Sequence, residues 1–285
     1  MTMEFRRYDN AEVFRADVLD NLLKNEILNN LAISILTESK ARNTSDWLMA
    51  AVVDGGEVSH AALNAKPFNL LLYEADSHRR DGMELLAKEI KRLSADPPCV
   101  FAERGLARRF ADAYASNHAA APERSMVVMR LDELADYKKA PGYCRELTVR
   151  DLYFAPFWER SFGEECRTQV FPIPDIVGRV SSRLGKGTHF VWEDGIPVSQ
   201  AVHGRSTPCG AVINMVYTPP HYRGRGYATS VVAKLSGLLL DGGKDFCCLF
   251  ADSGNPVAQG IYRKLGYYDV YTFDIVQFDT APQKS

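Results

Sequence analysis

The sequence predicts an α/β (α+β) protein with two halves of the same plan, each a mixed twisted sheet flanked by helices. Three observations lead to this prediction. The octapeptide DGGEVSHA at residues 54–61 returns as DGIPVSQA at 194–201, and each copy lies between two apolar runs. Asp-Gly between apolar runs is typical of a β-hairpin. Strand-like and helix-like segments then follow both copies in the same order, which indicates a repeated domain.

The first half begins with helical periodicity from Glu12 to Ile35, ahead of its hairpin. Behind the hairpin, runs with strand character alternate with runs of helical period. The runs expected to be strands or helices are 69–75, 82–93, 99–102, 104–115 and 125–131. Charged residues, proline and glycine cluster at 136–143, and such clusters mark connections between domains. The predicted domains are therefore 1–135 and 143–285.

The second half has helix-like segments near 150–160 and 173–184 ahead of its hairpin. After the hairpin we expect a strand at 211–218, a helix at 228–240, a strand at 246–251, a helix at 256–265 and a strand pair within 267–278. The helix at 228–240 has one apolar face, because its hydrophobic residues recur with a helical period. Both halves are therefore expected to follow the order hairpin, strand, helix, strand, helix, strand.

The composition narrows the classes of function. Hydrophobic residues make up 46% of the 285 residues and charged residues 25%, which is an ordinary globular balance. The formal net charge of −2 lacks the basic excess expected of a nucleic-acid-binding surface. The sequence has neither an apolar secretory leader nor an apolar run long enough to cross a membrane, so a cytoplasmic protein is expected. A homodimer is left open.

Six cysteines are present, and none belongs to a C-x-x-C pair or has a histidine at metal-ligand spacing. Two of them, Cys247 and Cys248, are adjacent in a strand-like run, where neighbouring side chains point to opposite faces. Such a pair is a poor chelator. We therefore expect reduced cysteines and no metal.

The segment TPPHYRGRGYATS at 218–230 carries the clearest chemical signal. It connects a predicted strand to the first turn of a predicted helix. The first backbone N–H groups of a helix have no partner within the helix, and the helix dipole is positive there. Gly224 and Gly226 would let an anion approach those groups, and Arg223 and Arg225 add positive charge. A ligand that carries phosphate is therefore expected at this turn.

The spacing separates three classes of phosphate-binding turn. A P-loop requires G-x-x-x-x-G-K-[ST], which does not occur. A dinucleotide-binding G-x-G-x-x-G fails because Thr229 stands at its third glycine. The remaining pattern, R-x-x-G-x-A from Arg223 through Gly226 to Ala228, resembles the pyrophosphate loop of the GNAT superfamily of acyl-CoA-dependent N-acyltransferases.

A second segment, GNPVAQGIYRKLGY at 254–267, is similar to another GNAT motif, N-x-x-[AS]-x-x-x-Y-x-x-x-G-[FY]. Its residues suit a short helix, because Asn255 is a good N-cap and Pro256 fits the first helical position. The resemblance implies a GNAT fold in both halves and acetyl-CoA as co-substrate. The residues it implies for cofactor binding are Val216, Tyr217, Thr218, Arg223, Gly224, Arg225, Gly226, Tyr227, Ala228, Thr229 and Asn255.

The resemblance also implies transfer of an acetyl group to a primary amine of a small molecule or peptide by direct attack. Tyr262 would then be the acid that protonates the leaving thiolate, and the backbone N–H near Val216 would stabilise the oxyanion. Many relatives carry a glutamate on the fourth strand, but 211–218 contains no carboxylate. The base therefore stays open between Glu193, His203, His189 and water. The alternative function is a non-catalytic acyl-CoA-binding regulatory module.

The first half is expected to be a degenerate GNAT-like domain that does not bind CoA. Its counterpart of the glycine loop has one glycine, Gly82, preceded by the bulky residues His78, Arg79, Arg80 and Asp81. Ala107 stands where the second half has an asparagine seven residues before its tyrosine, here Tyr114. Both anion-binding features are thus absent from the sequence. The alternative is an unrelated α/β domain.

Overall fold

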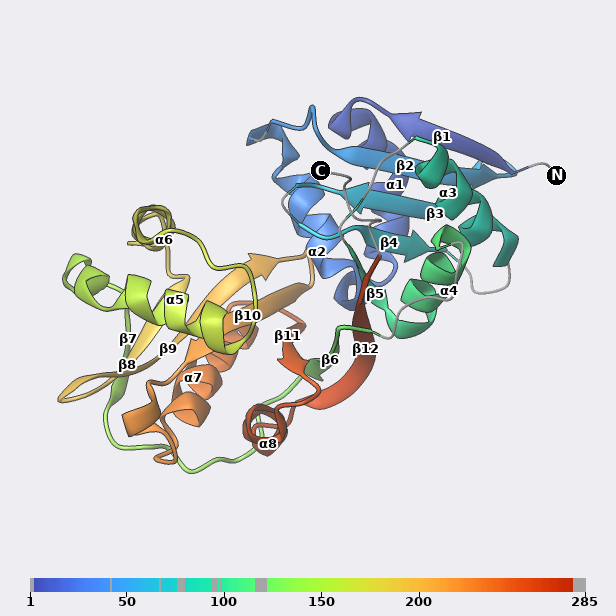
Figure 1. Cartoon of the computed structure of the whole chain (residues 1–285). Helices are drawn as coiled ribbons and strands as arrows, with labels where there is room; N and C mark the ends of the chain where they lie inside the picture. The colour runs from blue at the N-terminus through green and yellow to red at the C-terminus, as the bar shows by residue number, and fades with distance from the viewer. Residues whose placement is uncertain are drawn as a thin grey trace. The chain divides into compact units, whose positions relative to one another are not determined.

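The structure is a computed structural model, and it describes residues 3–41, 43–66, 68–75, 80–93, 97, 99–115 and 122–278 (Figure 1). The contacts divide the chain into two compact units. Unit 1 comprises Met1–Val127 with Tyr271–Ser285, and unit 2 comprises Val128–Val270. The functional domain boundaries at 1–135 and 143–285 stay a prediction. Among the described residues, no helix has the length and apolar character needed to span a membrane.

Unit 1 contains an antiparallel sheet with the strand order β1-β2-β3-β4. Its strands are β1 (Glu4–Tyr8), β2 (Leu48–Asp54), β3 (Glu57–Asn64) and β4 (Leu71–Glu74). Its helices are α1 (Ala11–Leu23), α2 (Glu26–Thr37), the 3-10 turn η1 (Ser39–Ala41), α3 (Arg80–Arg92) and α4 (Arg104–Tyr114). A further strand, β5 (Cys99–Glu103), pairs antiparallel with residues 273–277 of β12 (Tyr268–Gln277).

Both faces of the sheet in unit 1 are buried. Met49, Ala51 and Val53 of β2 pack into a core cluster with α1 and α2, while Ala50 and Val52 pack into a second cluster with α3 and α4. Successive strand residues point to opposite faces, so a strand with helices on both sides is apolar throughout. This explains why the segment before the first Asp-Gly shows no polar alternation.

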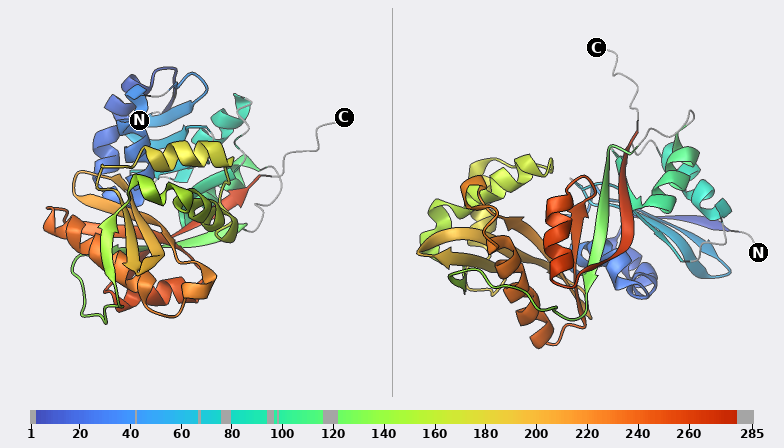
Figure 2. Two further views of the ribbon diagram at one scale, coloured as in Figure 1. Left: turned by 90° about the vertical axis from the view of Figure 1, so that its left-hand side faces the viewer. Right: turned by 90° about the horizontal axis from the view of Figure 1, so that it is seen from below.

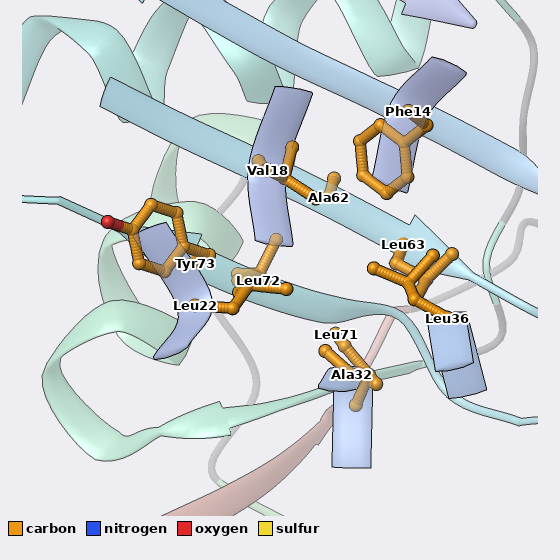
Figure 3. Close-up of a pocket in the computed structure, with 11 residues that line it drawn as sticks. Phe14, Val18, Leu22, Ala32, Leu36, Ala62, Leu63, Leu71, Leu72 and Tyr73 are labelled. Carbon is orange, nitrogen blue, oxygen red and sulfur yellow. The ribbon is translucent and has the colours of Figure 1, made fainter. Parts of the chain in front are cut away.

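A small apolar pocket lies in the first of these clusters (Figure 3). Its lining comes from α1, α2, β3 and β4: Phe14, Val18, Leu22, Ala32, Leu36, Ala61, Ala62, Leu63, Leu71, Leu72 and Tyr73. The one polar group of the lining is the hydroxyl of Tyr73, which points away from the other labelled side chains (Figure 3). A void with so few polar partners holds no ordered water, so it is a packing defect of the core.

Unit 2 has the strand order β6-β11-β10-β9-β8-β7. Its strands are β6 (Arg124–Leu131), β7 (Tyr143–Glu146), β8 (His189–Asp194), β9 (Ile196–Ser206), β10 (Gly210–Tyr217) and β11 (Phe246–Asp252). Its helices are η2 (Val149–Tyr153), α5 (Ala155–Glu165), α6 (Ile173–Ser181), η3 (Pro220–Tyr222), α7 (Tyr227–Asp241) and α8 (Pro256–Lys264). The strands β6 and β12 are neighbours in the sheet, and both units contain part of each (Figure 2).

Both predicted hairpins are confirmed. β2 pairs with β3, and β8 pairs with β9, in each case across the repeated Asp-Gly. Gly55 and Gly195, the glycines shared by the two copies, have φ of 61° and 72°. Glycine adopts this left-handed region without the cost that a side chain would add. The repeat therefore recurs because both turns need the same backbone conformation.

Two element predictions are wrong. The expected strand pair within 267–278 is one continuous strand, β12, because no turn residue interrupts the run from Tyr268 to Gln277. The single helix expected from Glu12 to Ile35 is two helices, α1 and α2. The first helix ends at Leu23 with Lys24 as its C-cap. Asn25 caps the second, since its side-chain oxygen accepts a hydrogen bond from the N–H of Leu28 at 3.1 Å.

Candidate active site

The strand β10 separates from its neighbour β11 part of the way along its length. The two pair in parallel only from Gly210 to Val212, whereas β10 stays paired with β9 as far as Tyr217. Met215 has φ of 50°, and the register with β9 shifts between Asn214 and Tyr217. A bulge of this kind bends the strand and redirects its backbone groups. The second part of β10 therefore has backbone groups that no β11 strand satisfies.

The glycine loop joins this strand end to the start of α7. Gly224 and Gly226 have φ of 77° and 81°, and Gly226 is the N-cap of α7. No side chain caps the helix, and the first N–H bonded back to the loop is that of Ser230, at 3.0 Å from the carbonyl oxygen of Gly226. The preceding N–H groups of the first turn are therefore available to an anion.

The residues expected to surround the cofactor arm are fixed by a small hydrogen-bond network. The hydroxyl of Ser199 contacts the hydroxyl of Thr218 at 2.8 Å and donates to the carbonyl of Tyr217 at 3.2 Å. The guanidinium of Arg223 donates from Nε to the carbonyl of Thr218 at 2.8 Å. The end of β10 and the glycine loop are thus held together as one rigid piece.

Two loop side chains have carboxylate partners that the sequence analysis did not identify. Arg223 forms an ion pair with Glu165 of α5 at 2.7 Å, and the hydroxyl of Tyr227 donates to Asp194 at 2.5 Å. The sequence does not reveal this role of Glu165, because Glu165 lies 58 positions from Arg223 along the chain and shares no local motif with it. The glycines and Arg225, by contrast, lie at the exposed tip of the loop.

The second GNAT-like motif forms α8 as the sequence predicts. Asn255 caps it by accepting a hydrogen bond from the N–H of Ala258 at 3.0 Å. Tyr262 is 8% exposed, and burial raises the pKa of its phenol far above the ordinary value, with a further contribution from the nearby Cys166 thiol. A phenol of this kind keeps its proton until a stronger acceptor appears beside it.

The three side chains considered as a base are engaged elsewhere. Burial lowers the pKa of His189 to about 4, and its Nε2 lies 3.2 Å from Oε1 of Gln200. The pKa of Glu193 is lowered by hydrogen bonds from Arg145 and Tyr143. Burial also lowers the pKa of His203, whose Nε2 contacts the hydroxyl of Ser206 at 2.9 Å. All three lie on the β8–β9 hairpin, as expected, and none lies on β10.

The segment of unit 1 that corresponds to the glycine loop has a different structure. Gly82 is not a turn residue, because it lies inside α3 and packs on the imidazole of His60. A Cβ at Gly82 would lie 2.3 Å from Cε1 of His60. His78 and Arg79 lie outside the described residues, and Asp81 belongs to the first turn of α3. The glycine therefore makes room for a buried side chain.

Among the described residues, no group of three or more histidine, cysteine or acidic side chains has a geometry that could hold a metal ion. The six cysteines form no disulfide. The polar groups at the parted strands of unit 2 include backbone amides, hydroxyls and paired charges. These groups suit the binding of an anionic ligand and a proton transfer.

A strand that parts from its parallel neighbour, followed by a glycine loop and an uncapped helix, is an arrangement that suits the binding of an anionic ligand. Residues 153–270 match the family model described as an acetyltransferase (GNAT) domain. This part of the chain is therefore similar to the acetyltransferase domains of the GNAT family. No curated protein is similar enough in sequence to count as a match.

Solved structures are similar over nearly the whole chain. A GCN5-related N-acetyltransferase from Sphaerobacter thermophilus has a TM-score of 0.68 at 16% identity, with 97% of this chain and 95% of that chain covered. A GNAT-family acetyltransferase from Colwellia psychrerythraea has 0.63 at 12%, with 97% and 100% covered. A tandem GNAT protein from the clavulanic acid biosynthesis pathway has 0.60 at 13%, with 99% and 100% covered. The tandem GNAT fold predicted from the sequence is confirmed.

Proposed function

We propose that unit 2 transfers the acetyl group of acetyl-CoA to a primary amine of a small molecule or peptide. The observation that carries the proposal is the glycine loop at the uncapped start of α7, directly after the parted strand β10. The N–H groups of Tyr227, Ala228 and Thr229 would bind the pyrophosphate, together with Gly224, Arg225 and Gly226. Val216, Tyr217 and Thr218 would bind the pantetheine arm through their backbone groups.

In the proposed reaction the amine nitrogen attacks the thioester carbonyl, so that an N–C bond forms and the C–S bond breaks. The backbone N–H of Val216 stabilises the oxyanion of the tetrahedral intermediate. The amine loses a proton to water, and the thiolate gains one from Tyr262. The raised pKa of Tyr262 keeps the phenol protonated before the reaction, although it also makes the phenol a weaker acid, so the role rests on the match of Tyr262 to the motif. Asn255 supports Tyr262 indirectly by starting α8.

Gly226→Asp tests cofactor binding, with the affinity for CoA measured by calorimetry. Wild-type protein should bind one CoA per chain, and the variant should lose affinity by at least tenfold, because its carboxylate would occupy the phosphate position. Gly243→Asp is the matched control. Gly243 also has a positive φ, of 92°, and open space around it, but it lies beyond the far end of α7. Equal CoA affinity in all three proteins would contradict the proposal.

The alternative proposal is a non-catalytic acyl-CoA-binding module. The absence of a carboxylate on β10 favours it, since the nearest side-chain bases are engaged on the β8–β9 hairpin. Release of CoA from acetyl-CoA in a panel of amine acceptors separates the two functions. Binding of acetyl-CoA without amine-dependent release of CoA would support the module and contradict the enzyme.

A further inference from the structure

Asn214 lies on β10 between the last residue paired with β11 and the bulge at Met215. It is two positions before Val216. Its antiparallel partner is Val202 of β9, whose other partner is His189 of β8. Directly paired residues in a sheet share a face. The side chains of Asn214 and His189 therefore lie on the same face of the sheet.

That face is the one covered by α5 and α6. Val191, two residues after His189 on β8, packs in a core cluster with Ala155 of α5 and Val180 of α6. The other face is covered by α7, because the thiol of Cys247 contacts the carbonyl of Ser236 at 3.8 Å. Side chains at alternate positions of a strand share a face. The helix that begins at the glycine loop thus covers one face, and Asn214 lies on the other.

Tyr262 belongs to the α7 side of the sheet. Its ring packs edge-on against that of Tyr267 at 5.9 Å, and the Tyr267 hydroxyl contacts that of Ser236 in α7 at 2.9 Å. In the proposed reaction the acid therefore reaches the leaving sulfur from this side. The attacking amine needs a separate approach to the same carbonyl carbon, and Asn214 lies on the opposite face of β10, the face on which α5 packs.

A glycine on the neighbouring strand makes room for the Asn214 carboxamide. A Cβ at Gly204 of β9 would lie 2.3 Å from Nδ2 and 2.7 Å from Oδ1 of Asn214. The Oδ1 atom is buried and has no hydrogen-bond partner among the residues described. A buried acceptor without a partner carries the desolvation cost of the group with nothing to offset it. The fold thus holds a hydrogen-bond acceptor beside the parted strands and leaves it unsatisfied.

The same face carries two more unsatisfied polar atoms. In the part of the chain that the structure describes, Nδ1 of His189 and Nε2 of Gln200 have no hydrogen-bond partner, and the two residues are 1% and 0% exposed. Gln200 pairs with Tyr217, at the end of β10. These two atoms lie inside the sheet, where a polar group without a partner carries a cost.

We propose that Oδ1 of Asn214 accepts a hydrogen bond from the attacking amine and turns the nitrogen lone pair toward the thioester carbonyl. This rests on the proposed acetyl transfer. A neutral carboxamide suits the step, since a carboxylate at this position would stabilise the protonated, unreactive ammonium form. The molecule that accepts the acetyl group is therefore a primary amine, which the neutral carboxamide binds as the free base. Water carries the proton of the amine away.

The first test replaces the carboxamide. Asn214→Leu keeps the volume and removes the acceptor, and we expect kcat/KM for the amine to fall about 10- to 100-fold with unchanged CoA affinity. Asn214→Asp keeps an oxygen acceptor, but its carboxylate would stabilise the ammonium form, so the pH profile should show an added ionisation, with the rise in activity displaced to higher pH. A purely structural role would lower thermal stability in both variants and add no new ionisation to the pH profile.

The second test uses Gly204, which does not itself contact the amine. Gly204→Ala should displace the carboxamide and lower kcat/KM for the amine, and Gly204→Ala combined with Asn214→Leu should lose no more than Asn214→Leu alone. Gly178→Ala is the control, because an added Cβ there meets no atom within 4 Å. Wild-type kcat/KM in Asn214→Leu, or full additivity in the double variant, would overturn the role of Asn214 while leaving acetyl transfer intact. A wild-type protein that acetylates no amine would instead overturn the proposed function itself.

Discussion

Glu165, the last residue of α5, accepts two hydrogen bonds from Nη2 of Arg223, at 2.8 Å to Oε1 and 2.7 Å to Oε2. The same carboxylate accepts a hydrogen bond from the Tyr217 hydroxyl at 3.3 Å. A negative charge is therefore held against the loop that we propose binds a pyrophosphate. The pair is about half exposed, so water screens it and its contribution to stability is small.

We expect Glu165→Gln to raise the affinity for CoA about two- to fivefold, because the change removes a like charge beside the phosphates. Calorimetry at two salt concentrations measures this, and the gain should shrink at high salt. Glu164→Gln is the control, since Glu164 pairs with Arg160 at 2.8 Å rather than with the loop. Weaker CoA binding in Glu165→Gln would mean that the pair is needed to hold the loop in shape.

Tyr262→Phe should lower kcat by about 10- to 1000-fold, the range typical of losing a general acid, with little change in CoA affinity. The substitution keeps the buried ring and removes only the hydroxyl. Tyr267→Phe serves as the control, because the Tyr267 hydroxyl contacts Ser236 and its loss should cost stability rather than kcat. Stopped-flow measurement of the chemical step is the readout. An unchanged rate of that step in Tyr262→Phe would exclude the acid role.

Gly82→Ala should destabilise the protein by about 1–3 kcal/mol, although the same change in an open helix interior stabilises by up to about 1 kcal/mol. The sign reverses because the new methyl group would meet the buried ring of His60. That ring cannot easily move, since its nitrogens contact Ser59 at 3.0 Å and Glu74 at 3.3 Å. Urea denaturation measures the change.

The comparison variant for Gly82 is Gly178→Ala in α6, where an added Cβ meets nothing within 4 Å. It should leave the free energy of unfolding unchanged or raise it. If Gly82→Ala proved as harmless as Gly178→Ala, the packing of α3 on His60 would be contradicted.

His189 should make stability depend on pH. Burial lowers its pKa from 6.5 to about 4 in the folded state, so the unfolded chain binds more protons between these values. The contribution is complete above pH 6.5 and is lost as pH falls toward 4, by up to about 3 kcal/mol. His189→Gln removes the titrating group. Urea denaturation from pH 4 to 8 should therefore show that the free energy of unfolding depends less steeply on pH in the variant than in wild type. Equal slopes would contradict the lowered pKa of His189.

The hairpins and the glycine loop could be predicted from the sequence because each requires a particular backbone conformation at one or two residues. Gly195 and Gly226 both need a positive φ, and only a few residue types supply it at low cost. Asn255 was likewise identifiable as a cap from its place before a proline. In each case the signal lies within a few positions of the residue that it concerns.

The rest of the candidate site depends on contacts between distant segments. Glu165 reaches Arg223 across 58 positions, and Asn214 is recognisable only once β9 is known to place Gly204 beside it. The division of α1 from α2 was missed for another reason. Apolar periodicity continues through Asn25, so the cap is visible only from its hydrogen bond. The continuous β12 is likewise set by a distant segment, because its residues 273–277 pair with β5.

The pairing of β12 with β5 sets an order of events in the making of this protein. Residues 273–277 supply the strand beside β5, and the fully buried Asp274 accepts hydrogen bonds from Arg104 at 3.2 Å and from Ser125 at 2.6 Å. Domains usually fold as they leave the ribosome, the N-terminal one first. Here β5, in the half that is translated first, has no partner strand until all of unit 2 and residues 273–277 have been synthesised. Completion of unit 1 therefore waits for the end of the chain, and until then one edge of β5 stays open.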